Sequence, residues 1–289
     1  MYIKVALIRP IYPMETTVRT LGPNEAKVVL SLREQNREAV RAADIIQILG
    51  SEPRARKVIR NLLRKGWLTR LIGGRYMFLP PEYGPESLGE NNVLALASAV
   101  VEPSYVGWWA AASFHGLTTQ KPMAIAVATL RQLPSRTIEG AEMRFVKVAK
   151  RKFFGFSRYN VYGRQVQLST PAKTVVDCVD RPDLAGGPAE VTRIVHGAKT
   201  EVDPHELADI AIKMQSTALL QRLGFLIDVA GWEFPADARE QLRSAIGKSS
   251  RSTFGHGQRR EHDIGYVADW GLFVNATRND LLADVPRLP

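Results

Sequence analysis

The chain has 289 residues, and the 45% that are hydrophobic are enough for one large core or two smaller ones, which argues against a mainly disordered chain. Its single cysteine, Cys178, excludes an internal disulfide and fits a reducing compartment. The first ten residues have too short an apolar run for a signal peptide, and later uncharged runs are far shorter than a bilayer span. We therefore expect a cytoplasmic protein that makes no contact with a membrane.

The positive charge is concentrated in the first part of the chain. Residues 1–80 contain 15 Lys/Arg and 6 Asp/Glu, a net charge of 15 − 6 = +9. Residues 81–289 contain 24 Lys/Arg and 23 Asp/Glu, a net charge of +1. Charge that served solubility alone would be spread along the chain, whereas this asymmetry is typical of a nucleic-acid-binding segment.

Residues 1–20 are predicted to form an arm ahead of the first domain. Lys4, Arg9 and Arg19 alternate with apolar residues and prolines, which favours an extended segment. Residues 2–8 alternate as one strand would. A packed strand is the simpler interpretation, and an arm in a DNA minor groove is the alternative.

Two apolar patterns at the helical period predict helices over residues 23–33 and 42–50, the second ended by Gly50. A third helix is predicted to follow at once. Ser51 or Glu52 can cap it, Pro53 suits its first turn, and Gly66 can end it.

The third helix has one apolar and one basic face. After Glu52 it contains no acidic residue, whereas a merely solvated face usually mixes both charges. A solvated basic face remains one interpretation, and a helix lying in a DNA major groove is the one we favour. The polar positions of this face are Arg54, Lys57, Arg60, Asn61 and Arg64.

A predicted hairpin follows the third helix. Residues 67–72 and 75–79 have strand composition, and Gly73-Gly74 between them can adopt the positive φ of a tight turn. Three helices and a hairpin predict a winged helix-turn-helix domain over residues 21–82. Arg54, Lys57 and Asn61 are expected at base edges, and Arg60, Arg64, Arg70 and Arg75 at phosphates. The complete predicted DNA-binding set is Arg54, Arg56, Lys57, Arg60, Asn61, Arg64, Arg70 and Arg75.

Residues 83–90 are rich in proline, glycine and acid, and predict a linker. Residues 91–289 mix strand-like and helical patterns, so the fold class is α+β, with a larger mixed α+β domain after the winged helix. Helices are expected over 92–101, 105–117, 169–177 and several stretches of 188–246. Strands are expected over 124–130, 144–149, 153–161, 166–168 and near 270–275.

This second domain has no clear catalytic pattern. Asp177, Asp180 and Asp183 are spaced as residues near a helix end, and a magnesium-dependent nuclease site is the less simple interpretation. The histidines of residues 256–263 alternate with arginines, which oppose a metal cation. Glycine-rich phosphate loops are missing, and Cys178 lies in an apolar stretch. We therefore expect no enzymatic activity, no cofactor and no metal site.

Several ordered motifs resemble one family, the AbiEi-type antitoxins of type IV (abortive-infection) toxin–antitoxin systems. The motifs are Gly66-Trp67-Leu68 with Gly73-Gly74-Arg75-Tyr76, residues 105–118, residues 169–182 with Gly186-Gly187, residues 220–225 and residues 270–275. The resemblance implies a winged helix that represses its own operon. It also implies a C-terminal domain that neutralises a nucleotidyltransferase-like toxin, with no stable complex required.

The resemblance implies double-stranded operator DNA as a partner, and paired copies on inverted repeats are an option. Two alternatives stay open at this point. One is a nuclease that uses the winged domain for targeting, and the other is a stand-alone regulator whose C-terminal domain senses a ligand.

Overall fold

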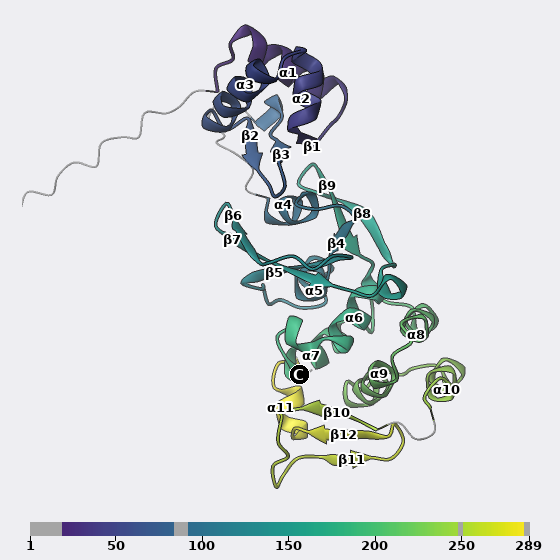
Figure 1. Cartoon of the computed structure of the whole chain (residues 1–289). Coiled ribbons are helices and arrows are strands. Elements are labelled where there is room, and N and C mark those ends of the chain that lie inside the picture. The colour runs from purple at the N-terminus through teal and green to yellow at the C-terminus, as the bar shows by residue number, and fades with distance from the viewer. Residues whose placement is uncertain (1–18, 84–91, 248–250, 286–289) are drawn as a thin grey trace, which may run out of the picture. The chain divides into compact units, whose positions relative to one another are not determined.

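A computed structural model describes residues 19–83, 92–247 and 251–285. The predictions for an arm at residues 1–18 and for a linker at 84–90 lie outside the described residues. The chain divides after Asn91 into two compact units, here called unit 1 and unit 2 (Figure 1).

Unit 1 contains, in its described residues, three helices and a small antiparallel sheet. The helices are α1 (Pro23–Glu34), α2 (Ala42–Leu49) and α3 (Glu52–Arg64), which confirm the three predicted helices. The strands are β1 (Ala39–Arg41), β2 (Leu68–Arg70) and β3 (Arg75–Phe78), in the order β1-β3-β2. The sequence pattern predicted β2 and β3 but missed β1, which is extended because it pairs with β3.

Tight turns in unit 1 depend on glycine. Gly50 ends α2 with φ 65°, and Gly73 and Gly74 connect β2 to β3 with φ 67° and 71°, a region that other residues enter at a cost. The apolar faces of the three helices and the sheet meet in one core, which includes Leu32, Ile45, Ile59, Leu62 and Phe78. This packing fixes which face of α3 is left to solvent.

Unit 2 is built around a six-stranded mixed sheet of order β6-β7-β5-β4-β9-β8. Its strands are β4 (Ser104–Val106), β5 (Ala124–Thr129), β6 (Arg136–Ile138), β7 (Ala141–Lys147), β8 (Phe156–Val161) and β9 (Arg164–Ser169). The β5–β7 and β4–β9 pairs are parallel, and the other pairs are antiparallel.

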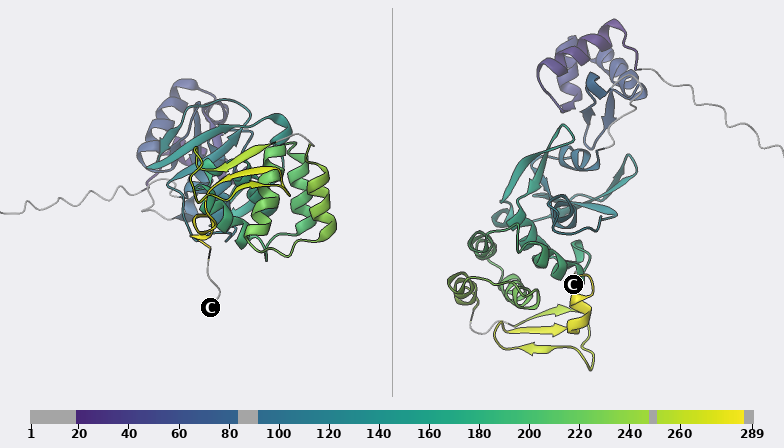
Figure 2. Two further views of the ribbon diagram at one scale, coloured as in Figure 1. Left: turned by 90° about the horizontal axis from the view of Figure 1, so that it is seen from below. Right: turned by 180° about the vertical axis from the view of Figure 1, so that it is seen from behind.

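Helices lie between this sheet and a second, three-stranded sheet in unit 2 (Figures 1 and 2). The helices of unit 2 are α4 (Val93–Ala99), α5 (Trp108–Phe114), α6 (Pro171–Asp180), α7 (Pro188–Gly197), α8 (Pro204–Lys213), α9 (Thr217–Val229), α10 (Ala236–Ser244) and α11 (Arg278–Leu282). The second sheet has the order β10-β12-β11, with β10 (Ser252–Gly255), β11 (Gly265–Val267) and β12 (Leu272–Asn275).

The mixed α+β class predicted from the sequence is confirmed, with one local correction. Tyr105 and Val106 were expected at the start of a helix, but they belong to β4, where Tyr105 is paired with Ala128 of β5. The helix begins only at Trp108. Within the residues that the structure describes, no helix is both long enough and apolar enough to cross a bilayer.

Candidate nucleic-acid interface

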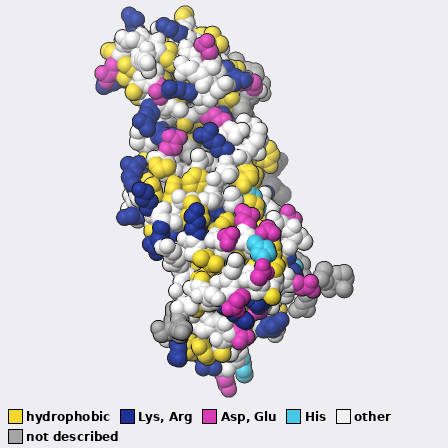
Figure 3. Space-filling view, turned by 90° about the vertical axis from the view of Figure 1, so that its right-hand side faces the viewer, with side chains coloured by type: hydrophobic (Ala, Val, Ile, Leu, Met, Phe, Trp, Pro, Cys, Tyr) yellow, Lys and Arg dark blue, Asp and Glu magenta, His cyan; other side chains and the backbone are white. Residues whose placement is uncertain are grey.

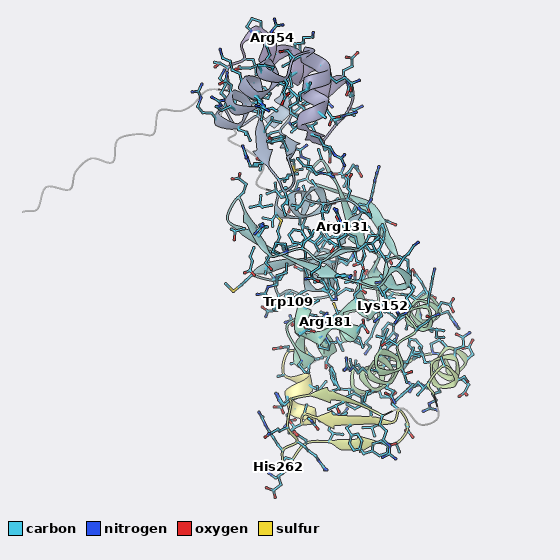
Figure 4. The ribbon with its side chains drawn as sticks, in the orientation of Figure 1. Arg54, Trp109, Arg131, Lys152, Arg181 and His262 are labelled. Atoms are coloured by element: carbon cyan, nitrogen blue, oxygen red, sulfur yellow. The ribbon has the colours of Figure 1, made fainter. Side chains whose placement is uncertain are left out.

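Helix α3 separates apolar from basic side chains. Ala55, Val58, Ile59 and Leu62 are buried in the unit 1 core. The opposite side exposes Arg54, Lys57, Arg60 and Arg64, and Figure 4 shows Arg54 on the outer surface of unit 1. We call these four side chains the α3 face.

The α3 face has no counter-charge within the described residues. Other cations of unit 1 are neutralised locally: Arg56 pairs with Glu52 one turn away at 2.5 Å, and Arg37 lies 2.7 Å from Asp44. By contrast, the α3 face has neither an ion pair nor a side-chain hydrogen bond to any part of the chain that the structure describes. Cations one turn apart repel each other, so the face fits a polyanion.

Asn61, predicted at a base edge, has an intrachain partner instead. It is half-buried, and its Nδ2 donates to Glu25 Oε1 over 2.8 Å. Glu25 is 5% exposed, and its Oε2 accepts from Lys65 Nζ at 2.6 Å and from the Gly22 N–H at 2.9 Å. This cluster, here called the Glu25 clamp, ties α3 to the start of α1. Asn61 therefore positions the helix and is not free to contact a base.

The electrostatics of the clamp favour an ionised Glu25. Burial raises the pKa of the Glu25 carboxyl. Hydrogen bonds from Lys65, the Gly22 N–H and Asn61 lower the same pKa by more than burial raises it, so the pKa of Glu25 lies below the ordinary value. A charged carboxylate therefore holds the two helices together.

The two hairpin arginines differ in their surroundings. Arg70 is exposed at the end of β2, with its guanidinium 5.9 Å from the centre of the Tyr76 ring. Arg75, expected just past the turn with few neighbours, is the first residue of β3, is half-buried and lies opposite Arg41 in the sheet register. Arg70 is thus the more accessible of the two.

Arg19, predicted as a cation of the arm, is buried. Its guanidinium stacks 3.7 Å from the centre of the Trp67 ring, and its Nη2 donates to the Leu79 carbonyl at 2.6 Å. Burial lowers the pKa of this guanidinium. The side chain anchors the segment before α1 and is not available to phosphate.

The three aspartates considered for a nuclease site in unit 2 each face a cation. Asp177 is buried with Lys173 and the Tyr105 hydroxyl, which donates to it over 3.1 Å. Asp180 lies 2.6 Å from Lys152, and Asp183 lies 2.7 Å from Arg181. The described residues contain no group of three or more metal-ligating side chains. These contacts make the aspartates structural ion pairs.

Unit 2 also contains a largely apolar cavity of about 830 Å³. It lies between α4, α5 and the turns that follow β6 and β8, and its lining includes Leu94, Phe114 and Ile125. Met123 and Tyr162 at its edge are 98% and 91% exposed. A cavity of this kind could hold a small apolar ligand, as the ligand-sensing alternative requires.

Of the comparisons with known proteins, one matches a part of unit 2 and another covers most of the chain. Residues 105–229 match the family described as the AbiEi antitoxin C-terminal domain. The crystal structure of the RV2827C protein from Mycobacterium tuberculosis is similar in fold, with a TM-score of 0.62 and 17% sequence identity over 93% of this chain and 96% of that one. A search of curated proteins found no match. The resemblance to AbiEi-type antitoxins that the sequence motifs indicated is therefore supported over residues 105–229.

Proposed function

We propose that unit 1 is a winged helix-turn-helix domain that binds operator DNA and represses the operon of this protein. Unit 2 neutralises a nucleotidyltransferase-like toxin encoded in the same operon, without enzymatic activity of its own. The antitoxin role follows from the family match, and the DNA-binding role is argued from unit 1.

The observation that supports DNA binding most strongly is the α3 face. Its four exposed cations have no acidic partner in the described part of the chain, on a helix whose other side is held in the core. A helix of this kind suits the major groove, with side chains near its N-terminus at base edges. Arg54 and Lys57 fill this role, and Arg60, Arg64 and Arg70 contact phosphates.

The Glu25 clamp supports the same assignment. Recognition by a helix requires that its angle be fixed, because side chains must reach base edges to within fractions of an ångström. Glu25 fixes α3 through Asn61, in the last turn of the helix, and through Lys65, which directly follows it. Asn61 thus contributes to recognition by position and not by base contact.

Two assays with the full-length protein test the proposal. The variant Lys57→Ala/Arg60→Ala removes two cations from the α3 face, and Lys27→Ala/Arg41→Ala removes two exposed cations from elsewhere in unit 1. In a reporter strain the first variant should lose repression and the second should keep it. Both should still protect cells from the co-encoded toxin, because unit 2 is intact.

The outcomes separate the two halves of the proposal. Full repression by a folded Lys57→Ala/Arg60→Ala protein refutes the α3 assignment. Loss of protection in both variants would place neutralisation in unit 1. Magnesium-dependent cleavage of DNA by purified protein would instead support the nuclease alternative.

The apolar cavity gives the ligand-sensing regulator one supporting observation. A small apolar ligand bound at Phe114 and Ile125 should raise the thermal stability of the protein. A ligand that also released operator DNA would favour this alternative over the antitoxin role.

A further inference from the structure

A second cavity of unit 2, of about 730 Å³, lies at the three-stranded sheet, where α9 and the end of α10 meet the turn between β11 and β12. Neither DNA binding nor toxin neutralisation gives this cavity a role. Its volume is typical of sites for small molecules, which measure about 300–1,000 Å³. We call it the β11 cavity, and its lining includes Gln221, Arg243, Arg251, Tyr266, Asp269 and Trp270.

Buried side chains form a fixed floor for the β11 cavity. Gln221 of α9 is fully buried, its Nε2 donates to the Gly271 carbonyl at 3.1 Å, and its Oε1 accepts from the Ser252 hydroxyl at 2.6 Å. Trp270 is 1% exposed, and its Nε1 donates to Asp228 of α9 at 2.7 Å. These bonds tie α9 to β10 and to the turn after β11, so the cavity is preformed.

Two arginines of the cavity wall have no acidic partner. The guanidinium of Arg243, in the last turn of α10, lies 5.1 Å from the centre of the Trp270 ring, and that of Arg251 lies 5.6 Å from the centre of the Tyr266 ring. Both side chains are exposed, and neither has an ion pair or a side-chain hydrogen bond within the described ranges. Arg239, one turn earlier on α10, is by contrast paired with an aspartate. Uncompensated guanidinium groups favour an anion, and their forked donors suit phosphate oxygens.

Tyr266 gives the cavity an aromatic wall. Its side chain is 48% exposed, and its ring centre lies 4.9 Å from that of Phe273, its partner in the β11–β12 register. The ring is therefore held by the sheet while part of it stays open, as a surface for stacking a nucleobase must be. Figure 3 shows hydrophobic side chains next to Lys and Arg side chains at the lower end of unit 2, where this sheet lies.

Asp269 narrows the choice of anion. It is the remaining charged side chain among the described lining residues, and it is exposed on the turn between β11 and β12. A carboxylate repels the carboxylates of an acidic peptide, whereas it can accept hydrogen bonds from ribose hydroxyls. A nucleic-acid strand needs a groove that continues past each nucleotide, whereas a concave cavity of this volume suits one small molecule. The lining thus offers a suitable group for the base, the ribose and the phosphates of a single nucleotide.

We propose that the β11 cavity binds a nucleoside diphosphate or triphosphate, with its base on Tyr266, its ribose hydroxyls at Asp269 and its phosphates at Arg243 and Arg251. The site uses none of the residues assigned to operator binding and does not depend on the antitoxin role. The inference therefore goes beyond the function proposed above.

Isothermal titration calorimetry of the full-length protein with ATP tests the cavity, with adenosine and inorganic pyrophosphate as the two halves of the ligand. ATP should bind at least about tenfold more tightly than either half, because only ATP makes both the base and the phosphate contacts. Absence of ATP binding up to about 1 mM overturns the proposal. Pyrophosphate or adenosine that binds as tightly as ATP also overturns it, because the preferred ligand would not be a nucleotide.

Substitutions of exposed side chains assign the binding to the cavity. Arg243→Ala and Arg251→Ala each remove charge-assisted hydrogen bonds and should weaken ATP binding by about 10- to 100-fold. Tyr266→Ala should weaken it by about 5- to 100-fold, and Tyr266→Phe, which keeps the ring, should bind as the wild type does. The matched control Arg136→Ala/Arg158→Ala removes two exposed arginines from the six-stranded sheet and should keep the wild-type affinity. Wild-type affinity in the folded arginine variants overturns the proposal.

Two further measurements exclude other origins of the signal. Arg54→Ala/Lys57→Ala should keep the wild-type affinity for ATP, because its cations lie in unit 1. A loss as large as that of Arg243→Ala would place the anion on the α3 face and overturn the proposal. A single strand of about six nucleotides should displace bound ATP less effectively than free ATP does. Displacement at lower concentrations than free ATP requires would overturn the choice of a free nucleotide.

Discussion

The Glu25 clamp gives the sharpest test of how unit 1 presents α3. Replacing Glu25 by alanine removes the acceptor of three hydrogen bonds. The half-buried Asn61 amide loses its acceptor, which lowers the free energy of unfolding by about 1–3 kcal/mol. The Gly22 N–H loses a capping contact, which lowers it by about 1 kcal/mol. The Lys65 ammonium, whose side chain is 18% exposed, can be hydrated once Glu25 is gone, so its loss of an ion pair adds little to this destabilisation. The free energy of unfolding should fall by about 2–4 kcal/mol.

Glu25→Gln keeps the shape of the side chain, removes its charge and replaces one acceptor oxygen by an NH2 donor, so it should lower the free energy of unfolding by about 1–2 kcal/mol at pH 7. Because the folded-state pKa of Glu25 is lowered, its contribution to stability is fully present above the unfolded pKa of about 4.3 and is lost as pH falls through the folded pKa. The stability difference between wild type and Glu25→Gln should therefore shrink below about pH 4.

Denaturant unfolding followed by far-UV circular dichroism between pH 7 and pH 3 measures both effects. Glu34→Gln, an exposed change on the same helix, is the control and should cost under about 0.5 kcal/mol. If Glu25→Ala is as stable as this control, or if the Glu25→Gln difference does not depend on pH, then the clamp does not hold α3.

Three further predictions concern unit 2. A Cβ on Gly224 would lie 2.3 Å from the Trp270 ring, so Gly224→Ala should lower the free energy of unfolding by about 1–3 kcal/mol, with an earlier tryptophan fluorescence transition. Lys173→Met leaves buried Asp177 without its cation and should lower the free energy of unfolding, measured by denaturant titration, by about 3–5 kcal/mol. A loss under about 1 kcal/mol would contradict the pairing of Lys173 with Asp177. Burial raises the pKa of the Cys178 thiol, so a thiol reagent at pH 8 should label the unfolded protein and leave the native protein unlabelled over minutes.

Local signals made much of the fold predictable. Helix α3 follows from its apolar period, from Pro53 in its first turn and from Gly66, and it occupies Glu52–Arg64 as expected. Strand β1, only three residues long, carries no such signal and depends on pairing with β3. Tyr105 was misassigned for a similar reason, because β4 is defined by its neighbours β5 and β9.

The exposed cations of the candidate site could be predicted from the charge pattern of α3 alone. Contacts between residues far apart in the sequence could not. The one-signed charge of α3 pointed to Arg54, Lys57, Arg60 and Arg64. The partner of Asn61 lies 36 residues earlier in the chain, so no local pattern could show that its amide is engaged.

The central claim is that the α3 face recognises operator DNA. Its most direct test is the affinity of the full-length protein for the DNA immediately upstream of its own gene, measured by fluorescence anisotropy against an unrelated duplex of equal length. Wild type should prefer the upstream DNA by at least about 1,000-fold, as specific binders do, and Arg54→Ala/Lys57→Ala should lose most of that preference. Equal affinity of the wild type for the two duplexes, or an unchanged preference in the folded variant, would contradict the account.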